Sequence, residues 1–139
     1  CGTKVYFKNV TCLKCGHALG FDPDTLAVIA LTPDAEPGLY RRITGDTRQV
    51  LRYCSNVVHG ACNWLTRADD QNLFCVACDL NRTIPNLSEP GSLTAWQDLE
   101  RAKKRLVYSL LRFGLPLDTS PAPPGRLIFD FARNTMTGH

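Results

Sequence analysis

The chain has 139 residues, of which 44% are hydrophobic and 21% charged, so one domain with a modest buried core is expected. No segment approaches the roughly 18 consecutive apolar residues of a membrane-spanning helix, which argues against a membrane protein. The formal net charge is +3. Thiolates bound to zinc would bring the metallated chain close to neutral, which weakens any case for nucleic-acid binding that rests on net charge.

Seven cysteines are the most informative part of the composition. An odd number does not suit a closed disulfide framework, and four of the seven form the Cys-x-x-Cys pairs Cys12/Cys15 and Cys75/Cys78. Disulfides and thioredoxin-like redox chemistry are the alternatives, but a disulfide within such a pair closes a very small loop. Zinc binding fits the pairs better and implies a reducing compartment, so we expect a cytoplasmic protein.

The first cysteine region covers residues 1–24 and is expected to be a zinc ribbon. A Cys-x-x-Cys turn places two sulfurs on one edge of a zinc tetrahedron, and a following glycine tolerates positive φ. Cys12 and Cys15 form a complete knuckle of this kind, whereas Cys1 is only the second half of one. This site therefore lacks its fourth ligand in the chain as given, and the neighbouring His17 is an alternative ligand.

Residues 25–90 are expected to form a β-rich region. The apolar run 25–31 has the length of a strand, and residues 39–43 and 49–53 flank a turn in the manner of a hairpin. Within the first region, residues 5–7 also have strand character.

The β-rich region also contains a complete set of four zinc ligands, Cys54, Cys62, Cys75 and Cys78. The close Cys75/Cys78 pair is the more specific signal, and His59 is a rival ligand. Four thiolates leave no coordination position open for water, so the site is expected to be structural and not catalytic.

Residues 91–139 are expected to hold one long helix, a Pro-rich loop at 117–125 and a strand at 126–131. Ser92 or Thr94 is placed to cap the helix start, Thr94 with Gln97 has capping-box spacing, and Gly114 is placed for the C-cap. The apolar stripe of the helix consists of Trp96, Leu99, Leu106, Val107, Leu110 and Phe113. The basic run 103–105 is assigned to the solvated face, with Glu100 one turn before Lys104.

Together these elements predict a small α+β fold: a zinc-stabilised β-rich half, a second four-cysteine site and one long amphipathic helix. Catalytic signals are weak, because the histidines His17, His59 and His139 are scattered and neither His-Glu-x-x-His nor a Gly-rich phosphate loop is present. We therefore predict no catalytic residue.

Several strings of the chain occur in the same order in a bacterial family. They are "CNWL" from Cys62, "CDLNRTIP" from Cys78, "AKKRLVY" from Ala102, and "LGF" from Leu19 after the opening knuckles. The chain thus resembles zinc-ribbon proteins described as carrying a zinc-binding metallopeptidase domain. The resemblance implies that the His-Glu-x-x-His helix lies beyond His139 and that the chain is cut at both ends.

Three functions are open at this point. The first is a zinc-binding N-terminal part of a metallopeptidase-like protein, with a structural or docking role toward the absent catalytic region or a protein partner, and without activity of its own. The second is a stand-alone nucleic-acid-binding zinc module, which is suggested by the mixture of the aromatic Tyr6 and Phe7 with Lys4, Lys8 and Lys14. A solvated hairpin face is the favoured interpretation of these residues. The third is a protein-interaction module that uses the long helix or the Pro-rich segment.

Overall fold

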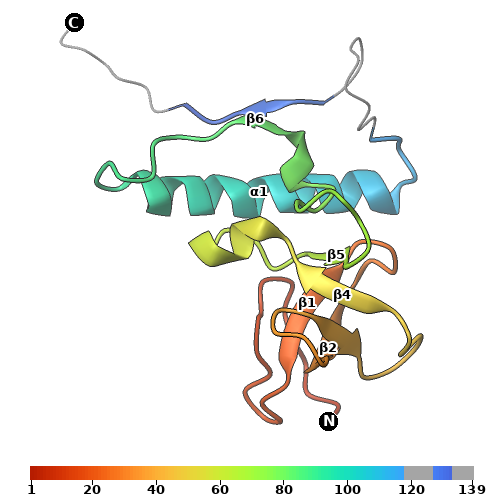
Figure 1. The fold of residues 1–139 in the computed structure, drawn as a ribbon. Coiled ribbons are helices and arrows are strands. Elements are labelled where there is room, and N and C mark those ends of the chain that lie inside the picture. Colours follow the sequence, from red (N-terminus) through yellow and green to blue (C-terminus); the bar gives the residue numbers. More distant parts are fainter. Residues whose placement is uncertain (118–126, 133–139) are drawn as a thin grey trace, which may run out of the picture.

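The computed structural model describes residues 1–117 and 127–132 (Figure 1). A β-rich N-terminal half precedes one long helix, so the expected α+β class is confirmed. Figure 1 shows α1 (Ser92–Arg112) lying between the main sheet on one side and a short pair of strands on the other. The division of the chain near residues 24 and 90 stays a prediction, and His139 and most of the Pro-rich segment lie outside the described residues.

The main sheet is a five-stranded meander in which each strand pairs antiparallel with the next one in sequence. Its strands are β1 (Ala18–Asp22), β2 (Ala27–Pro33), β3 (Tyr40–Arg42), β4 (Val50–Tyr53) and β5 (Leu65–Arg67). The expected hairpin is formed by β3 and β4, and the apolar run from residue 25 contributes most of β2. Short turn-rich connections favour such sequential pairing, because neighbouring strands need little chain to reach one another.

The sheet curls so that the chain just before β5 returns to β1. The backbone N–H of Phe21 donates to the carbonyl of Asn63 at 2.9 Å, and Phe21 forms a parallel bridge with Trp64. Both aromatic side chains are fully buried. Their rings lie 4.4 Å apart between centroids, so the first strand and the second cysteine region share one core.

An aromatic group joins the N-terminal segment to the sheet and to α1. Phe7 packs edge-to-face against Phe21 at 4.8 Å and against Tyr108 of the helix at 5.6 Å between ring centroids. Residues 5–7 were expected to form a strand, and this is wrong: Tyr6 and Asn9 form a turn instead. The turn directs Phe7 into the core, and the aromatic burial outweighs the β propensity of these residues.

Two 3₁₀ helices and a second, two-stranded sheet complete the described fold. The 3₁₀ helices are η1 (Ser55–His59) and η2 (Cys78–Leu80). The strands β6 (Asn81–Thr83) and β7 (Phe129–Asp130) pair parallel to one another. The strand expected at 126–131 is therefore present over two residues.

The buried face of α1 differs from the expected stripe. Trp96 and Val107 are fully buried as expected, but Leu99, Leu106 and Phe113 are 49%, 46% and 79% exposed. Apart from Ser92 in the first turn, the remaining buried positions of the helix are charged, namely Glu100, Lys103 and Lys104. Assigning Lys103 and Lys104 to the solvated face was wrong, and the reason is the cysteine cluster beside them, described below. Within residues 1–117 and 127–132, no helix has the length and hydrophobicity to cross a bilayer.

The two ends of α1 are built differently. Gly91, in the left-handed region with φ of 79°, precedes the helix and no side-chain capping bond is formed, so the expected cap by Ser92 or Thr94 is wrong. Gln97 instead donates from Nε2 to the carbonyl of His59 at 2.7 Å. At the other end, Gly114 has φ of 69°. The Gly114 and Leu115 N–H groups, each 3.0 Å from its acceptor, donate to the carbonyls of Leu111 and Leu110, which is a Schellman motif.

Candidate metal centres

Four cysteines from three parts of the chain meet beside α1. Cys54 follows β4, Cys62 lies after η1, and Cys75 and Cys78 lie on either side of the turn into η2. Their sulfur atoms all lie within 4.8 Å of one another, and all four residues are buried. The structure therefore brings together the four residues that the sequence marked as one ligand set.

Local backbone geometry explains why the sulfurs converge. Gly60, with φ of 64°, ends η1 in the left-handed region and turns the chain back toward Cys62. The N–H of Asp79 donates to the carbonyl of Cys75 at 2.9 Å and closes the turn that sets Cys75 beside Cys78. Since η2 continues from Cys78 in a right-handed conformation, this knuckle needs no glycine after its second cysteine.

The residues fit a zinc ion in charge and in spacing. The sulfurs of Cys62 and Cys75 are 3.7 Å apart, which matches the edge of a tetrahedron with Zn–S bonds of about 2.3 Å. Backbone N–H groups of Trp64 and Cys78 lie 3.4 Å from the sulfurs of Cys62 and Cys75. Such donors favour thiolates, the form in which cysteine binds metal. Four sulfur ligands would fill all four coordination positions of a tetrahedral zinc ion, so none would remain for water or substrate.

A buried lysine faces the cluster from α1. Lys104 Nζ lies 3.4 Å from the Cys78 sulfur, 2.7 Å from Glu100 Oε2 and 3.3 Å from the carbonyl oxygen of Ala61. Lys104 is 3% exposed and Glu100 is 0% exposed. A buried cation needs compensating charge, and here one carboxylate and one thiolate provide it. This is the physical reason why the basic run does not face solvent.

The second buried lysine links the same carboxylate to the β6–β7 pair. Lys103 Nζ donates to Glu100 Oε1 at 2.8 Å and to Asn81 Oδ1 at 2.5 Å, while Asn81 Nδ2 donates to Glu100 Oε1 at 2.8 Å. The Lys103 ammonium also lies 5.6 Å from the ring centroids of Phe129 and Phe131, within the range of a cation–π contact. All polar atoms of Glu100 are thus satisfied inside the protein.

The electrostatics of the cluster follow from burial and hydrogen bonding. Burial raises the pKa of the Cys62 and Cys75 thiols well above their ordinary value. Hydrogen bonds from the other three cysteines, together with Lys104, lower the pKa of Cys78. Burial alone would lower the pKa of Lys104, but the Cys62 and Cys78 thiolates and Glu100 raise it. Burial favours the protonated thiols, and a divalent cation would take the place of their protons. Metal binding at this site would therefore release protons.

The first cluster contains three sulfurs. Those of Cys1, Cys12 and Cys15 lie within 4.8 Å of one another, with Cys1 and Cys12 3.7 Å apart. Gly16 has φ of 74°, and its N–H donates to the Cys12 carbonyl at 2.8 Å, as a glycine-terminated knuckle requires. The backbone N–H groups of Cys15 and Lys14 lower the pKa of Cys12. Unlike the fully buried four-cysteine set, this cluster includes the exposed Cys1.

Neither of the histidines considered as ligands belongs to a group of mutually close ligand atoms. His17 Nδ1 is 3.2 Å from the Cys15 sulfur, but His17 does not belong to the group of mutually close ligand atoms around Cys1, Cys12 and Cys15. His59 packs against Trp96 with ring centroids 5.8 Å apart. It does not belong to the four-cysteine group either.

Sequence reasoning missed the buried charges that contact the four-cysteine cluster. Glu100, Lys103 and Lys104 lie four, seven and eight residues after the buried Trp96, and Val107 lies eleven residues after it. This is the spacing of a single helix face. The helical spacing of these charged residues was therefore visible in the sequence, but a buried face defined only by apolar residues leaves them out.

The first 89 residues match the model of the zinc-ribbon domain family. This match covers more than half of the chain, and the chain belongs to this family. Together with the two cysteine clusters, the family assignment supports zinc as the cofactor.

The similarity to curated proteins covers the whole chain and not only the 89 residues of the zinc-ribbon match. The chain is 29% identical over 144 aligned residues to proteins named "uncharacterized protein" in Mycobacterium tuberculosis and Mycobacterium bovis. The alignment covers all of this chain and 38% of each relative. No solved structure matches the chain.

Proposed function

We propose that the chain is a zinc-stabilised structural and docking module with no catalytic chemistry of its own. The observation that carries the proposal is the buried set Cys54, Cys62, Cys75 and Cys78. Four thiolates saturate a tetrahedral zinc ion, whereas a catalytic zinc keeps a position for water or substrate. The ion would tie the ends of β4 and η1 to η2, against which α1 packs through Lys104, and so present the surfaces around them to a partner.

The finer proposal is that this module serves a larger metallopeptidase-like protein. It rests on the sequence resemblance described above, and the comparisons add only that the relatives are longer than this chain. In that setting the module would dock the catalytic region or its substrate.

An activity assay separates a docking module from an enzyme. The zinc-loaded chain is incubated with a mixture of general peptide substrates, and the products are read by mass spectrometry. We expect no cleavage above that of a matched Cys78→Ser preparation. Cleavage that requires zinc and disappears in the variant would overturn the non-catalytic proposal.

A nucleic-acid-binding module is the second candidate function. The observation that favours it is a basic groove between the N-terminal segment, the sheet and α1, which is considered next.

A further inference from the structure

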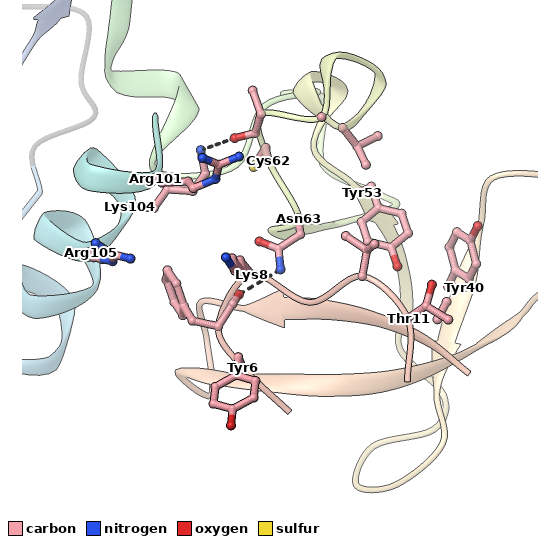
Figure 2. A pocket seen from close by; sticks show the side chains of 16 residues that line it. Tyr6, Lys8, Thr11, Tyr40, Tyr53, Cys62, Asn63, Arg101, Lys104 and Arg105 are labelled. Atoms are coloured by element: carbon pink, nitrogen blue, oxygen red, sulfur yellow. Dashed lines mark hydrogen bonds between the residues drawn. The ribbon is translucent and has the colours of Figure 1, made fainter. Parts of the chain in front are cut away.

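A groove of about 820 Å³ lies between α1 and Tyr40 and Tyr53 of the sheet. Among the described residues that line it, four are cationic and none carries a carboxylate. Figure 2 shows Arg101, Lys104 and Arg105 reaching in from the helix, Lys8 in the middle, and Tyr40 and Tyr53 on the opposite side, with Tyr6 apart from them. The groove is therefore cationic at one end and aromatic at the other.

The cationic end has charge available for an anion. Lys104 is compensated by Glu100 and the Cys78 sulfur, but Lys8 and Arg105 are exposed and form no ion pair within the described residues. Arg101 pairs with Asp98 at 2.5 Å on the surface, and such exposed pairs contribute little. Arg101 and Arg105 lie one helical turn apart, so their guanidinium groups share one side of α1.

The aromatic end is formed by Tyr40 and Tyr53. Their ring centroids are 5.3 Å apart at an interplanar angle of 73°, so the two rings present differently oriented surfaces. The Tyr53 hydroxyl donates to the carbonyl of Leu19 at 2.7 Å, and burial raises its pKa to about 12. The phenol therefore stays neutral and fixed in position, which suits a stacking surface.

We propose that this groove binds a short segment of single-stranded nucleic acid. Backbone phosphates would lie against Lys8, Arg101 and Arg105, and a base would pack against Tyr40 and Tyr53. Cationic tracks with adjacent aromatic rings are the general means of binding single strands without a strict sequence preference. An acidic peptide would use the cations but leave the aromatic end without a matching group.

The local charge distribution explains how a chain with a formal net charge of only +3 can have such a site. Lys8 belongs to the N-terminal segment, and Arg101 and Arg105 lie more than 90 residues later in α1. The fold brings them to one groove, whereas net charge averages them with distant carboxylates. The inference rests on the second candidate function, a nucleic-acid-binding module, and names the kind of nucleic acid that is bound.

The test uses a fluorescein-labelled oligouridine and the zinc-loaded chain, with binding followed by anisotropy over a series of salt concentrations. The variant Lys8→Glu/Arg105→Glu removes both unpaired cations. Its matched control is Arg112→Glu, which changes an exposed arginine of the same helix outside the groove. A third variant, Tyr40→Leu, removes one ring and keeps an apolar side chain in its place.

We expect the Kd to rise at least about tenfold in the double variant and to change less than about twofold in Arg112→Glu. The slope of log K against log salt should become shallower by about 1.4 in the double variant, since each phosphate contact of a single strand contributes about 0.7. Tyr40→Leu should weaken binding at least about fivefold without changing that slope.

Three results would overturn the inference: no binding at low salt, equal losses in Arg112→Glu and the double variant, or tighter binding of a labelled polyglutamate peptide than of the oligouridine. Zinc content and unfolding curves are measured for every variant. A folded, zinc-loaded and inactive chain that does not bind the oligonucleotide would refute the nucleic-acid partner while leaving the docking role intact.

Discussion

Lys104 occupies a position on α1 where an apolar residue would ordinarily be expected. It remains charged there because Glu100 and the Cys78 sulfur lie at hydrogen-bonding distance. A four-thiolate zinc site carries excess negative charge, so a nearby ammonium group lowers the cost of burying it. The same interaction fixes the rotation of the helix about its axis relative to the cysteine cluster.

Replacing Lys104 by methionine therefore should destabilise the protein although it makes the helix face more apolar. We expect a loss of about 2–3 kcal/mol in unfolding free energy, below the 3–5 kcal/mol typical of a broken buried pair because Lys103 still contacts Glu100. Urea unfolding of the zinc-loaded protein provides the measurement. The neighbouring Arg105→Met is the matched control, since Arg105 is exposed. Equal stability of the two variants would refute a role for the buried charge.

The C-terminal end of α1 depends on the backbone conformation of one residue. Gly114 has φ of 69°, and an added Cβ would meet no atom within 4 Å. The cost of Gly114→Ala is then conformational, about 1 kcal/mol. We expect Gly114→Asn to lose less, because asparagine enters the left-handed region more readily. Thermal unfolding monitored at the helix band would compare them, and an alanine variant as stable as the wild type would contradict the Schellman assignment.

The close approach of β1 to β5 depends on the absence of a side chain at Gly20, which leaves room for the Leu65 side chain. A Cβ at Gly20 would lie 2.7 Å from side-chain carbons of Leu65, which is itself buried. We expect Gly20→Ala to cost about 1–3 kcal/mol through overpacking. The double variant Gly20→Ala/Leu65→Val should recover part of that loss in the same urea experiment. Purely additive effects would show that the two positions do not touch in solution.

At the scale of elements, the sequence predicted where helices and strands lie in the chain better than which of their faces are buried. The long helix and the β3–β4 hairpin were found because hydrophobic periodicity and turn residues are local signals. The buried face of α1 was assigned wrongly because its charged members are compensated by Cys78 and Asn81, which are distant in sequence. Phe7 was misplaced in a strand for a similar reason: its partners Phe21 and Tyr108 are contributed by the tertiary fold.

At the scale of the whole molecule, zinc would connect elements that otherwise share a small core. Apparent zinc-binding free energies in small zinc peptides are about 10–16 kcal/mol, comparable with the entire stability of a domain. We therefore expect a strong chelator to abolish cooperative unfolding and the near-ultraviolet circular dichroism of the buried aromatic group. Added zinc should restore both, whereas magnesium should not. A chain that keeps its tertiary signal without zinc would not need the metal for its fold.

The candidate site could be read from sequence because its ligands are cysteines with characteristic spacing. The Cys-x-x-Cys spacing marks Cys75 and Cys78 as metal ligands, and Cys54 and Cys62 complete the set of four. The groove could not be found in the same way, since its cations and tyrosines are each unremarkable until the fold brings them together. The buried charged residues of α1 are an intermediate case. Their spacing marks one helix face, but this is recognised only if charged residues are counted together with apolar ones.

Native mass spectrometry of the chain and two paired variants tests the central claim most directly. We predict that Cys12→Ser/Cys15→Ser retains a zinc ion, whereas Cys75→Ser/Cys78→Ser loses the ion that Cys54, Cys62, Cys75 and Cys78 would hold. The mass reports bound zinc whether or not a variant is fully folded. If the Cys75→Ser/Cys78→Ser variant bound as much zinc as the wild type, the four-thiolate site could not be the metal centre that organises this fold.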